Sequence, residues 1–434
     1  MRILWLTNFI PPVFGDKLGI DSNNKEGWIS GILSELMANC PRDMKLYIAV
    51  PTPVLFPEGY IGDFDGVSLY GYRELSSEIY SENLEKDFSK ILELLNPDVI
   101  HIFGTEYPHT RAMLEAVNKD GEKLGISTDR VLIGMQGVCG EIWKHYLDGV
   151  PRYIARKNSF RDILKKDGLK KQVKKFETRA KNERRALSLT GNVTGRTAFD
   201  KAYIDKWAKD ATYYSMNESL RPEFYGKKWE CDKCEPHTIF ASQGNYPVKG
   251  LHYLIPAFEK LLANYPDARL VVAGDNITKH KSIKDKLKLQ AYAKYLLKLE
   301  KEVAEATGKP FKVDYVGSLK TADMLETYMK ASVFVCPSTV ENSPNSLGEA
   351  MLMGMPVVAA KVGGIPSMVK DREEGLLYEA GNIDQMVKCI SDIWDDAILR
   401  NTICTGAARR AAATHNRETN YLRLMEIYKS ISER

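Results

Sequence analysis

Short runs of β-branched and aromatic residues alternate along the chain with longer stretches whose apolar residues recur every three or four positions. The first half contains six such short runs, RILWLTNF, KLYIAVP, GVSLYGY, PDVIHIFG, VLIGMQG and NVTG. Between them lie stretches such as WISGILSELMANC and LEKDFSKILELL, which have the spacing of amphipathic helices. Strands that alternate with helices predict βαβ units and a parallel sheet.

The same alternation begins again in the second half. The predicted strands there are HTIFASQG, ARLVVAGD, FKVDYVGS, ASVFVCPS, PVVAA and EGLLYE. The intervening residues 217–236 are polar and irregular and are typical of an inter-domain linker. We therefore expect an α/β fold with two Rossmann-like domains, residues 1–215 and 216–414, which face each other across a cleft that holds a ligand. Residues 415–434 are predicted to form a final helix.

The composition is that of a globular protein. Of the 434 residues, 44% are hydrophobic and 27% are charged, which argues against a disordered, collagen-like or coiled-coil chain. The net charge of +4 is too small to indicate a partner by itself. No apolar stretch approaches the roughly 18 residues of a membrane-spanning helix. The opening MRILWLTNFIPP lacks a small-residue cleavage site, so we interpret it as a buried strand and not as a signal peptide.

The seven cysteines are scattered and odd in number. They form no visible disulfide framework, which favours a reducing, cytoplasmic location. Cys231 and Cys234 form a C-x-x-C pair, and His237 is near enough in sequence to be a third metal ligand. A fourth ligand is missing, so we expect a plain surface linker here and no metal site.

The most informative segment is 337–366, PSTVENSPNSLGEAMLMGMPVVAAKVGGIP. A predicted strand is followed by a loop with Glu341, and Glu349 follows after seven residues. We expect Glu349 to open a helix that ends at Gly354. The free N–H groups of the preceding residues 342–347 and the helix dipole would form an anion site, and a carboxylate can accept hydrogen bonds from a vicinal diol. Together these features predict a nucleotide-sugar site.

This segment resembles glycosyltransferase family 4, the "group 1" family of retaining enzymes with the GT-B fold, and ENSPNSLGEAM is similar to a bacterial branch. The resemblance extends over FASQGNYPVKGLHYLIPAFEKLLANYPDARLVVAGD, with a Lys-Gly at a helix start, and over FKVDYVGSLKTADMLETYMKASVFVCPS. In the first half it is weaker and rests on a strand, a loop that contains proline and glycine, and the later PDVIHIFG. Several motifs in the right order are more specific than an isolated pair of glutamates.

The resemblance implies roles for individual residues. Glu341 should contact the transferred sugar, and Lys249 should neutralise the leaving pyrophosphate, where a fixed cation stabilises the transition state most. Glu349 should bind the ribose hydroxyls. The remaining donor contacts implied are the backbone amides of Asn345, Ser346, Leu347 and Gly27. Taken singly, each of these residues also has an ordinary interpretation as a solvated lysine, a helix-start charge or a turn residue.

The sequence departs from the family pattern at several points. The family has an arginine about five positions before Lys249, where this chain has Gly244; Arg196 and Arg221 are candidates for the missing cation. A family histidine is replaced by Gln136, which cannot take a proton at neutral pH, and His109 is a candidate substitute. Gly27 follows a glutamate instead of a second glycine. The family uses no catalytic metal, and we expect no cofactor.

Residues 152–185 form a strongly basic stretch, with 14 lysines and arginines against 4 acidic residues. Apolar residues are interspersed among them, so we predict an amphipathic helical region within the acceptor-binding first domain. A lipid-linked acceptor at an anionic membrane surface would explain it. The alternative is a solvated helix face whose apolar side packs on its own domain. Nucleic acid is not an expected partner, because no nucleic-acid-binding module is recognisable.

These observations predict a retaining glycosyltransferase that moves a sugar from a nucleoside-diphosphate sugar to an acceptor hydroxyl by front-face displacement. We expect it to be cytoplasmic or peripheral on the inner membrane face, in bacterial surface polysaccharide or glycolipid synthesis. The resemblance also implies that the last helix packs back on the first domain. Two alternatives stay open: a nucleotide-sugar epimerase of the same fold, which needs no acceptor, and a non-catalytic partner protein that has kept the fold.

Overall fold

A computed structural model describes residues 1–434 except 19–28, 53–58 and 74–75. The chain folds into two compact units, and neither is continuous in sequence. Unit 1 comprises Met1–Trp143, Lys175–Pro222 and His415–Arg434, and unit 2 comprises Lys144–Lys174 and Glu223–Thr414. The structure thus differs from a single boundary at residue 215, because a segment of the first half belongs to unit 2.

Unit 1 is built on an eight-stranded sheet in the order β3-β4-β2-β1-β5-β6-β7-β8. All neighbouring strands are parallel except β3, which runs antiparallel to β4. The strands are β1 (Arg2–Leu6), β2 (Lys45–Thr52), β3 (Tyr60–Phe64), β4 (Val67–Arg73), β5 (Val99–Phe103), β6 (Val131–Gly134), β7 (Asn192–Gly195) and β8 (Thr212–Ser215). Every strand predicted in this half is confirmed; β3 and β8 are additional.

Both faces of this sheet are buried, as the apolar strands require. In β1, Leu4 and Leu6 enter one hydrophobic core, whereas Ile3 and Trp5 enter the other. The helices of the unit are α1 (Pro12–Gly15), α2 (Ser30–Asn39), α3 (Glu82–Leu95), α4 (Pro108–Leu124), α5 (Cys139–His145), α9 (Ala198–Trp207) and α18 (Arg417–Ser432), with 3₁₀ turns η1 (Asp16–Leu18) and η4 (Thr128–Arg130). Helix α5 ends in unit 2, and helix α8 (Leu169–Leu187) begins in unit 2 and ends in unit 1.

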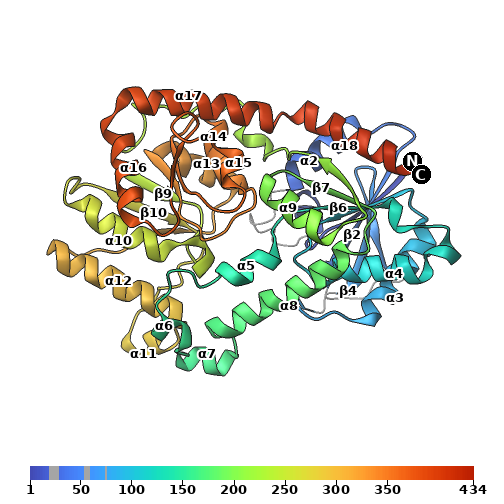
Figure 1. The fold of residues 1–434 in the computed structure, drawn as a ribbon, viewed down its shortest axis with the longest axis horizontal. Coiled ribbons are helices and arrows are strands. Elements are labelled where there is room, and N and C mark those ends of the chain that lie inside the picture. Colours follow the sequence, from blue (N-terminus) through green and yellow to red (C-terminus); the bar gives the residue numbers. More distant parts are fainter. Residues whose placement is uncertain (19–28, 53–58, 74–75) are drawn as a thin grey trace. The chain divides into compact units, whose positions relative to one another are not determined.

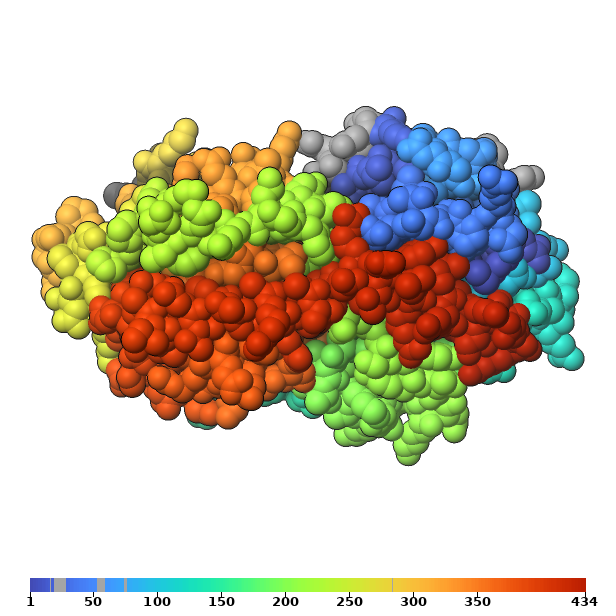
Figure 2. Space-filling model, turned by 90° about the horizontal axis from the view of Figure 1, so that it is seen from above, coloured from blue at the N-terminus to red at the C-terminus, as the bar shows by residue number. Residues whose placement is uncertain are grey.

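The last helix, α18, packs on unit 1 next to α2 (Figures 1 and 2). Its Leu424, Ile427 and Ile431 are fully or almost fully buried in the same core as Ile3 and Trp5. Trp5 Nε1 donates a hydrogen bond to the Tyr428 hydroxyl at 2.7 Å, and that hydroxyl lies 2.7 Å from His101 Nδ1. The C-terminal residues therefore complete the core around the first strand.

Replacing Tyr428 with phenylalanine should lower the free energy of unfolding of unit 1. The change leaves the Trp5 N–H and His101 Nδ1 without their partner, and an unpaired buried polar group costs about 1–3 kcal/mol. Tyr421→Phe is the matched control, because its hydroxyl bonds Asn39 in an exposed setting and should matter by about 0.5 kcal/mol or less. Urea unfolding of the two variants measures the difference; equal losses would contradict the expectation.

Unit 2 is built on a six-stranded parallel sheet in the order β11-β10-β9-β12-β13-β14. The strands are β9 (Thr238–Ala241), β10 (Arg269–Ala273), β11 (Asp314–Gly317), β12 (Val333–Cys336), β13 (Val357–Ala360) and β14 (Leu376–Tyr378), all confirmed as predicted. The helices are α6 (Arg152–Arg156), α7 (Phe160–Lys165), α10 (Leu251–Leu262), α11 (Ile283–Leu287), α12 (Ala291–Thr307), α13 (Thr321–Lys330), α14 (Asn345–Leu352), α15 (Ile365–Met368), α16 (Ile383–Asp395) and α17 (Ala397–Thr414), with 3₁₀ turns η5 (Pro222–Phe224) and η6 (Pro247–Lys249).

Two predictions about segments need correction. The basic stretch is not one helical region of the first domain: it forms α6, α7 and part of α8, and Ile154 and Leu169 are buried in the core of unit 2. The predicted linker is irregular but not only polar surface, because Phe224 and Trp229 are buried in unit 2. No helix in the described part of the chain is long and apolar enough to cross a membrane.

Candidate active site

In unit 2 the loops after β9 and β12 are tied together at the carboxyl ends of these neighbouring parallel strands. The N–H of Thr339, after β12, donates to the Val248 carbonyl, after β9, at 2.8 Å. The loop after β12 is also bonded to the loop after β13, where the N–H of Gly364 donates to the Glu341 carbonyl at 2.9 Å. Ligands of open parallel sheets bind at this edge. The backbone therefore brings the loop that holds Lys249 against the loop that holds Glu341.

The two predicted catalytic side chains form an ion pair. Lys249 Nζ lies 2.6 Å from Glu341 Oε1, and Ser338 Oγ donates to the same oxygen at 2.8 Å. Their side chains are only 20% and 13% exposed. Burial by itself lowers the pKa of Lys249, but the adjacent carboxylate outweighs it and raises the pKa above its ordinary value. Lys249 is thus held as an ammonium group against Glu341, on the loop after β12.

Helix α14 begins earlier than the sequence suggested. We expected Glu349 to open it, but its first residue is Asn345, preceded by Pro344 in an extended conformation. Asn345 and Ser346 therefore lie in the first turn, where helical N–H groups have no partner within the helix. The N–H of Leu347 already donates to the Pro344 carbonyl at 3.0 Å. The N–H groups predicted to bind an anion thus lie in the first turn of α14, one turn before Glu349.

Glu349 lies in the second turn of α14 and is 3% exposed. Its Oε2 is 3.5 Å from the Tyr328 hydroxyl, which donates its main hydrogen bond to the Ser346 carbonyl at 2.9 Å. Ser346 Oγ is in turn 3.1 Å from Ser242 Oγ, on the loop after β9. Glu349 is thus a buried carboxylate beside the first turn of the helix, joined to both loops through Tyr328 and Ser346.

Two glycines explain the shape of the Lys249 loop. Gly250 has a φ of +70°, and a Cβ there would lie 1.8 Å from the Pro337 carbonyl oxygen, so only glycine lets the two loops approach. Gly244 occupies the position where the family resemblance led us to expect an arginine. A Cβ there would lie 2.6 Å from Leu251 Cδ2 and 3.0 Å from Val272 Cγ1. Leu251 and Val272 thus fill the space that a longer side chain would need.

Replacing Gly250 with alanine should lower the free energy of unfolding of unit 2 by more than the cost of placing alanine at a positive φ. Gly308 has a similar φ of +67° with nothing near its Cβ position, so Gly308→Ala measures the conformational cost of about 1–2 kcal/mol by itself. Gly250→Ala should add about 1–3 kcal/mol of overpacking to that cost. Urea unfolding of both variants provides the comparison, and equal destabilisation would show that the loops do not need this contact.

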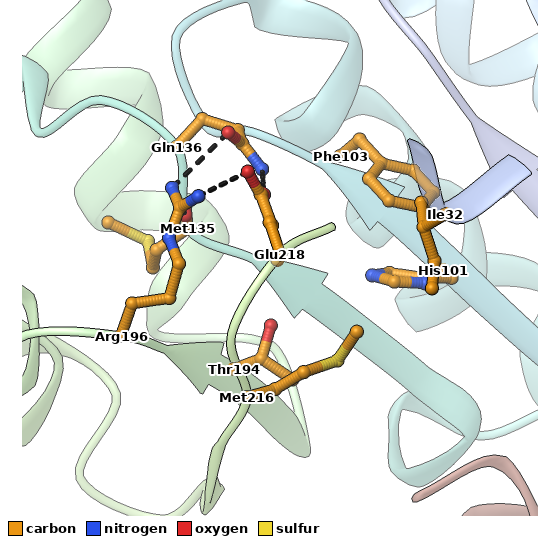
Figure 3. Close-up of a pocket in the computed structure, with 10 residues that line it drawn as sticks. Ile32, His101, Phe103, Met135, Gln136, Thr194, Arg196, Met216 and Glu218 are labelled. Carbon is orange, nitrogen blue, oxygen red and sulfur yellow. Dashed lines mark hydrogen bonds and ion pairs between the residues drawn. The ribbon is translucent and has the colours of Figure 1, made fainter. Parts of the chain in front are cut away.

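A pocket in unit 1 lies at the carboxyl ends of β5, β6 and β7 (Figure 3). Gln136 and Arg196, both predicted contacts, line it and converge on Glu218. Arg196 forms an ion pair with Glu218, and Gln136 Nε2 donates to the same carboxylate. Arg196 Nη2 also donates to the Met135 carbonyl at 3.0 Å and to Gln136 Oε1 at 3.3 Å. The full lining is Ile32, His101, Phe103, Gly134, Met135, Gln136, Thr194, Arg196, Met216 and Glu218.

His101 also lines this pocket, and sequence reasoning had missed it. It is 2% exposed, and burial lowers its pKa to about 3, so the ring is neutral. The Tyr428 hydroxyl accepts from Trp5 and lies 2.7 Å from His101 Nδ1. The other ring nitrogen, Nε2, is buried and has no partner among the described residues. The pocket is thus lined by a neutral imidazole and by the Arg196–Glu218 pair.

The other predicted residues lie elsewhere. His109 is not in the pocket: it is buried at the start of α4, its ring lies 5.5 Å from that of Tyr72, and burial lowers its pKa to about 3. Gly27 falls outside the described residues. The ring of His237 bonds Asp267 at 2.9 Å. Among the residues that the structure describes, no three histidine, cysteine or acidic side chains gather in a way that could hold a metal ion.

The sequence model of the family "Glycosyl transferases group 1" matches residues 227–410. A mannosyltransferase of Corynebacterium glutamicum, named as GDP-mannose-dependent, is 29% identical over 38% of this chain and 39% of its own length. The sulfoquinovosyl transferase of Arabidopsis thaliana is 32% identical over 40% of this chain and 31% of its own length. The alignments thus span less than half the length of these curated relatives.

Solved structures match nearly the whole chain at low sequence identity. Sucrose-phosphate synthase from Thermosynechococcus elongatus has a TM-score of 0.68 at 16% identity, with 99% of each chain covered. The Anabaena protein HepE, solved in complex with UDP and glucose, has a TM-score of 0.64 at 15% identity, covering 99% of this chain and 100% of its own. Identity at this level establishes the fold, and the family match lies on unit 2, where Lys249 and Glu341 meet. The chain therefore has the GT-B fold, and its residues 227–410, in unit 2, match the group 1 glycosyl transferases.

Proposed function

We propose that this protein transfers a sugar from a nucleoside-diphosphate sugar to an acceptor hydroxyl with retention of anomeric configuration. The observation that carries the proposal is the partly buried Lys249–Glu341 ion pair, 2.6 Å long, in which Glu341 lies on the loop that leads into the first turn of α14. An ammonium group and free helix N–H groups together suit a diphosphate. The names of the relatives, which include a GDP-mannose-dependent enzyme and a complex with UDP and glucose, make these two donor types the first to test.

In this proposal each residue acts at a different part of the donor. Lys249 leaves its pairing with Glu341 to neutralise the diphosphate, whose charge grows as the bond to the sugar breaks. Glu341 and the amides of Asn345 and Ser346 hold the sugar and the diphosphate, and Glu349 accepts from the ribose hydroxyls. The acceptor oxygen bonds the anomeric carbon on the face that the diphosphate leaves, and a diphosphate oxygen takes the acceptor proton. Lysine and helix N–H groups supply the positive charge, so the proposal needs no metal.

The acceptor is proposed to bind unit 1, where Gln136, Arg196 and Glu218 offer donors and acceptors to sugar hydroxyls. We place the reaction in the cytoplasm at the inner membrane face, with a sugar or lipid-linked acceptor of a bacterial surface polysaccharide or glycolipid. The basic stretch 152–185 supports this location, because exposed lysines attract anionic lipids.

The experiment is to incubate the protein with UDP-glucose and GDP-mannose, with and without simple sugar and lipid acceptors, and to follow the released nucleoside diphosphate. NMR of the product then gives the anomeric configuration. The proposal requires release that depends on the acceptor and a product with the donor's configuration. A product with inverted anomeric configuration would rule out the retaining mechanism. A rearranged sugar formed without acceptor would support the epimerase instead.

A further inference from the structure

Helix α7 (Phe160–Lys165) has an unusual amphipathic pattern: its three apolar residues are exposed, whereas its Asp162 and the N-cap Ser159 are buried. Phe160, Ile163 and Leu164 are 63%, 62% and 67% exposed. Ser159 and Asp162, in contrast, are 5% and 3% exposed. The helix lies at the lower edge of unit 2 with α6 and α11 (Figure 1). A cluster of three large exposed apolar side chains, rimmed by polar residues, is typical of an interaction surface.

Polar contacts fix this orientation. Ser159 and Asp162 form a capping box, in which each side chain accepts from the backbone N–H of the other. Asp162 Oδ2 also accepts from the N–H of Ala291 at 2.9 Å, which ties the helix to the start of α12. Arg161 donates to both oxygens of Asp167, at 2.7 and 2.8 Å. Because these bonds hold the polar side against unit 2, the apolar side cannot turn inward.

The surface around the three apolar residues is cationic. Between Arg156 and Lys171 there are seven lysines and arginines and two carboxylates. Both carboxylates, Asp162 and Asp167, are paired with Arg161. The other six cations are exposed, and they are Arg156, Lys157, Lys165, Lys166, Lys170 and Lys171. Apolar side chains surrounded by cations are complementary to a bilayer that has anionic headgroups over hydrocarbon.

We propose that residues 156–171 form a membrane-docking surface, which inserts Phe160, Ile163 and Leu164 into an anionic lipid bilayer while the surrounding cations bind the headgroups. This deepens the membrane association in the proposed function, because it commits to one occupant and names the residues that enter the lipid. It also places the surface on unit 2, the unit that carries the donor site. Docking itself does not require that the transfer reaction occurs.

The test is binding of the full chain to vesicles, without donor or acceptor. Vesicles of phosphatidylcholine mixed with phosphatidylglycerol should retain the protein, and pure phosphatidylcholine should not. The triple variant Phe160→Ser, Ile163→Ser, Leu164→Ser should bind the anionic vesicles at least about tenfold more weakly than the unchanged protein, because most of the inserted apolar area is lost. Lys165→Glu with Lys166→Glu should have a loss of about the same size, since each cation contributes about 1 kcal/mol near an anionic surface.

Two controls change similar residues elsewhere on unit 2. Ile398→Ser removes an apolar side chain that is 82% exposed, and Lys309→Glu with Lys312→Glu reverses two exposed charges; neither should alter binding. In Leu164→Trp the new indole should shift its fluorescence to the blue on anionic vesicles. A melting temperature close to that of the unchanged protein shows that the variants fold.

The outcomes separate the possible occupants. Equal binding to neutral and anionic vesicles, or unchanged binding of the triple variant, would overturn the proposal. So would a dimer in sedimentation velocity that the triple variant abolishes, because the surface would then cover a second copy of the chain. A protein that binds vesicles but no nucleotide would refute the proposed transfer and leave the docking surface standing.

Discussion

Lys249→Met should lower kcat for sugar transfer by about 10²- to 10³-fold, the usual cost of removing one group that stabilises a developing charge. The side chain is nearly buried and paired with Glu341 at 2.6 Å, so in the free protein the ammonium is already positioned. It gains most when the leaving diphosphate acquires its charge, so kcat should fall more than donor affinity. Because Glu341 raises the pKa of Lys249, activity should not fall through loss of this charge in the mildly alkaline range.

Lys260→Met is the matched control for this variant. Lys260 is in helix α10, which follows Lys249, but it is exposed and its partner is Asp384, so kcat should not change. Initial rates of nucleoside diphosphate release give kcat and KM for both. Methionine leaves Glu341 with Ser338 as its remaining partner, so urea unfolding must accompany the kinetics. If Lys249→Met is folded and as active as Lys260→Met, the ion pair is only structural.

Glu349→Gln should raise the Kd for the nucleoside diphosphate by about 10- to 100-fold, since charge-assisted hydrogen bonds contribute about 1.5–3 kcal/mol and 1.4 kcal/mol is a factor of ten. Glutamine keeps the size of the side chain, which matters because Glu349 is 3% exposed in a packed helix. The hydroxyl of Tyr328 is 3.5 Å from the carboxylate and donates a shorter hydrogen bond to the Ser346 carbonyl. An ionised carboxylate accepts at both oxygens, and glutamine removes the charge that strengthens those bonds.

Glu326→Gln is the control for the loss of a negative charge, because Glu326 is exposed on α13 and pairs with Lys330. Isothermal titration with the nucleoside diphosphate measures the affinity of both variants. Once bound, the Glu349→Gln protein should turn over with a kcat changed much less than that of Lys249→Met. If Glu349→Gln lowers the free energy of unfolding but binds nucleotide normally, Glu349 stabilises the fold and does not bind the nucleotide.

The strands and the Lys249–Glu341 site could be predicted from sequence because both depend on local patterns. Parallel strands are nearly continuous apolar runs, and the two residues follow strands that are neighbours in the sheet. The start of α14 was misplaced, because Gly348 and the preceding prolines resemble a loop although Pro344 acts as the N-cap. A local pattern gives the propensity of a segment to be helical, but the N-cap Pro344 sets where α14 begins.

Long-range packing could not be predicted. The pattern of residues 152–185 predicts helices but does not say which core receives Ile154 and Leu169. Nor does it show that Asp162 would bond Ala291 and turn the apolar side of α7 outward. His101 lies within the predicted strand PDVIHIFG, Glu218 belongs to no motif, and the two lie far apart in sequence. Only the parallel order of β5, β6 and β7 brings them to one pocket.

The most direct test of a working donor site is the melting temperature of the purified protein with UDP, GDP, ADP, CMP and buffer alone. A ligand at 100 times its Kd adds about 2.7 kcal/mol of stability, so one nucleoside diphosphate should raise the melting temperature by several degrees. Lys249→Met and Glu349→Gln should reduce that shift, and Lys260→Met should not. If no nucleotide shifts the melting temperature of the unchanged protein, unit 2 is not a donor site and the non-catalytic alternative is favoured.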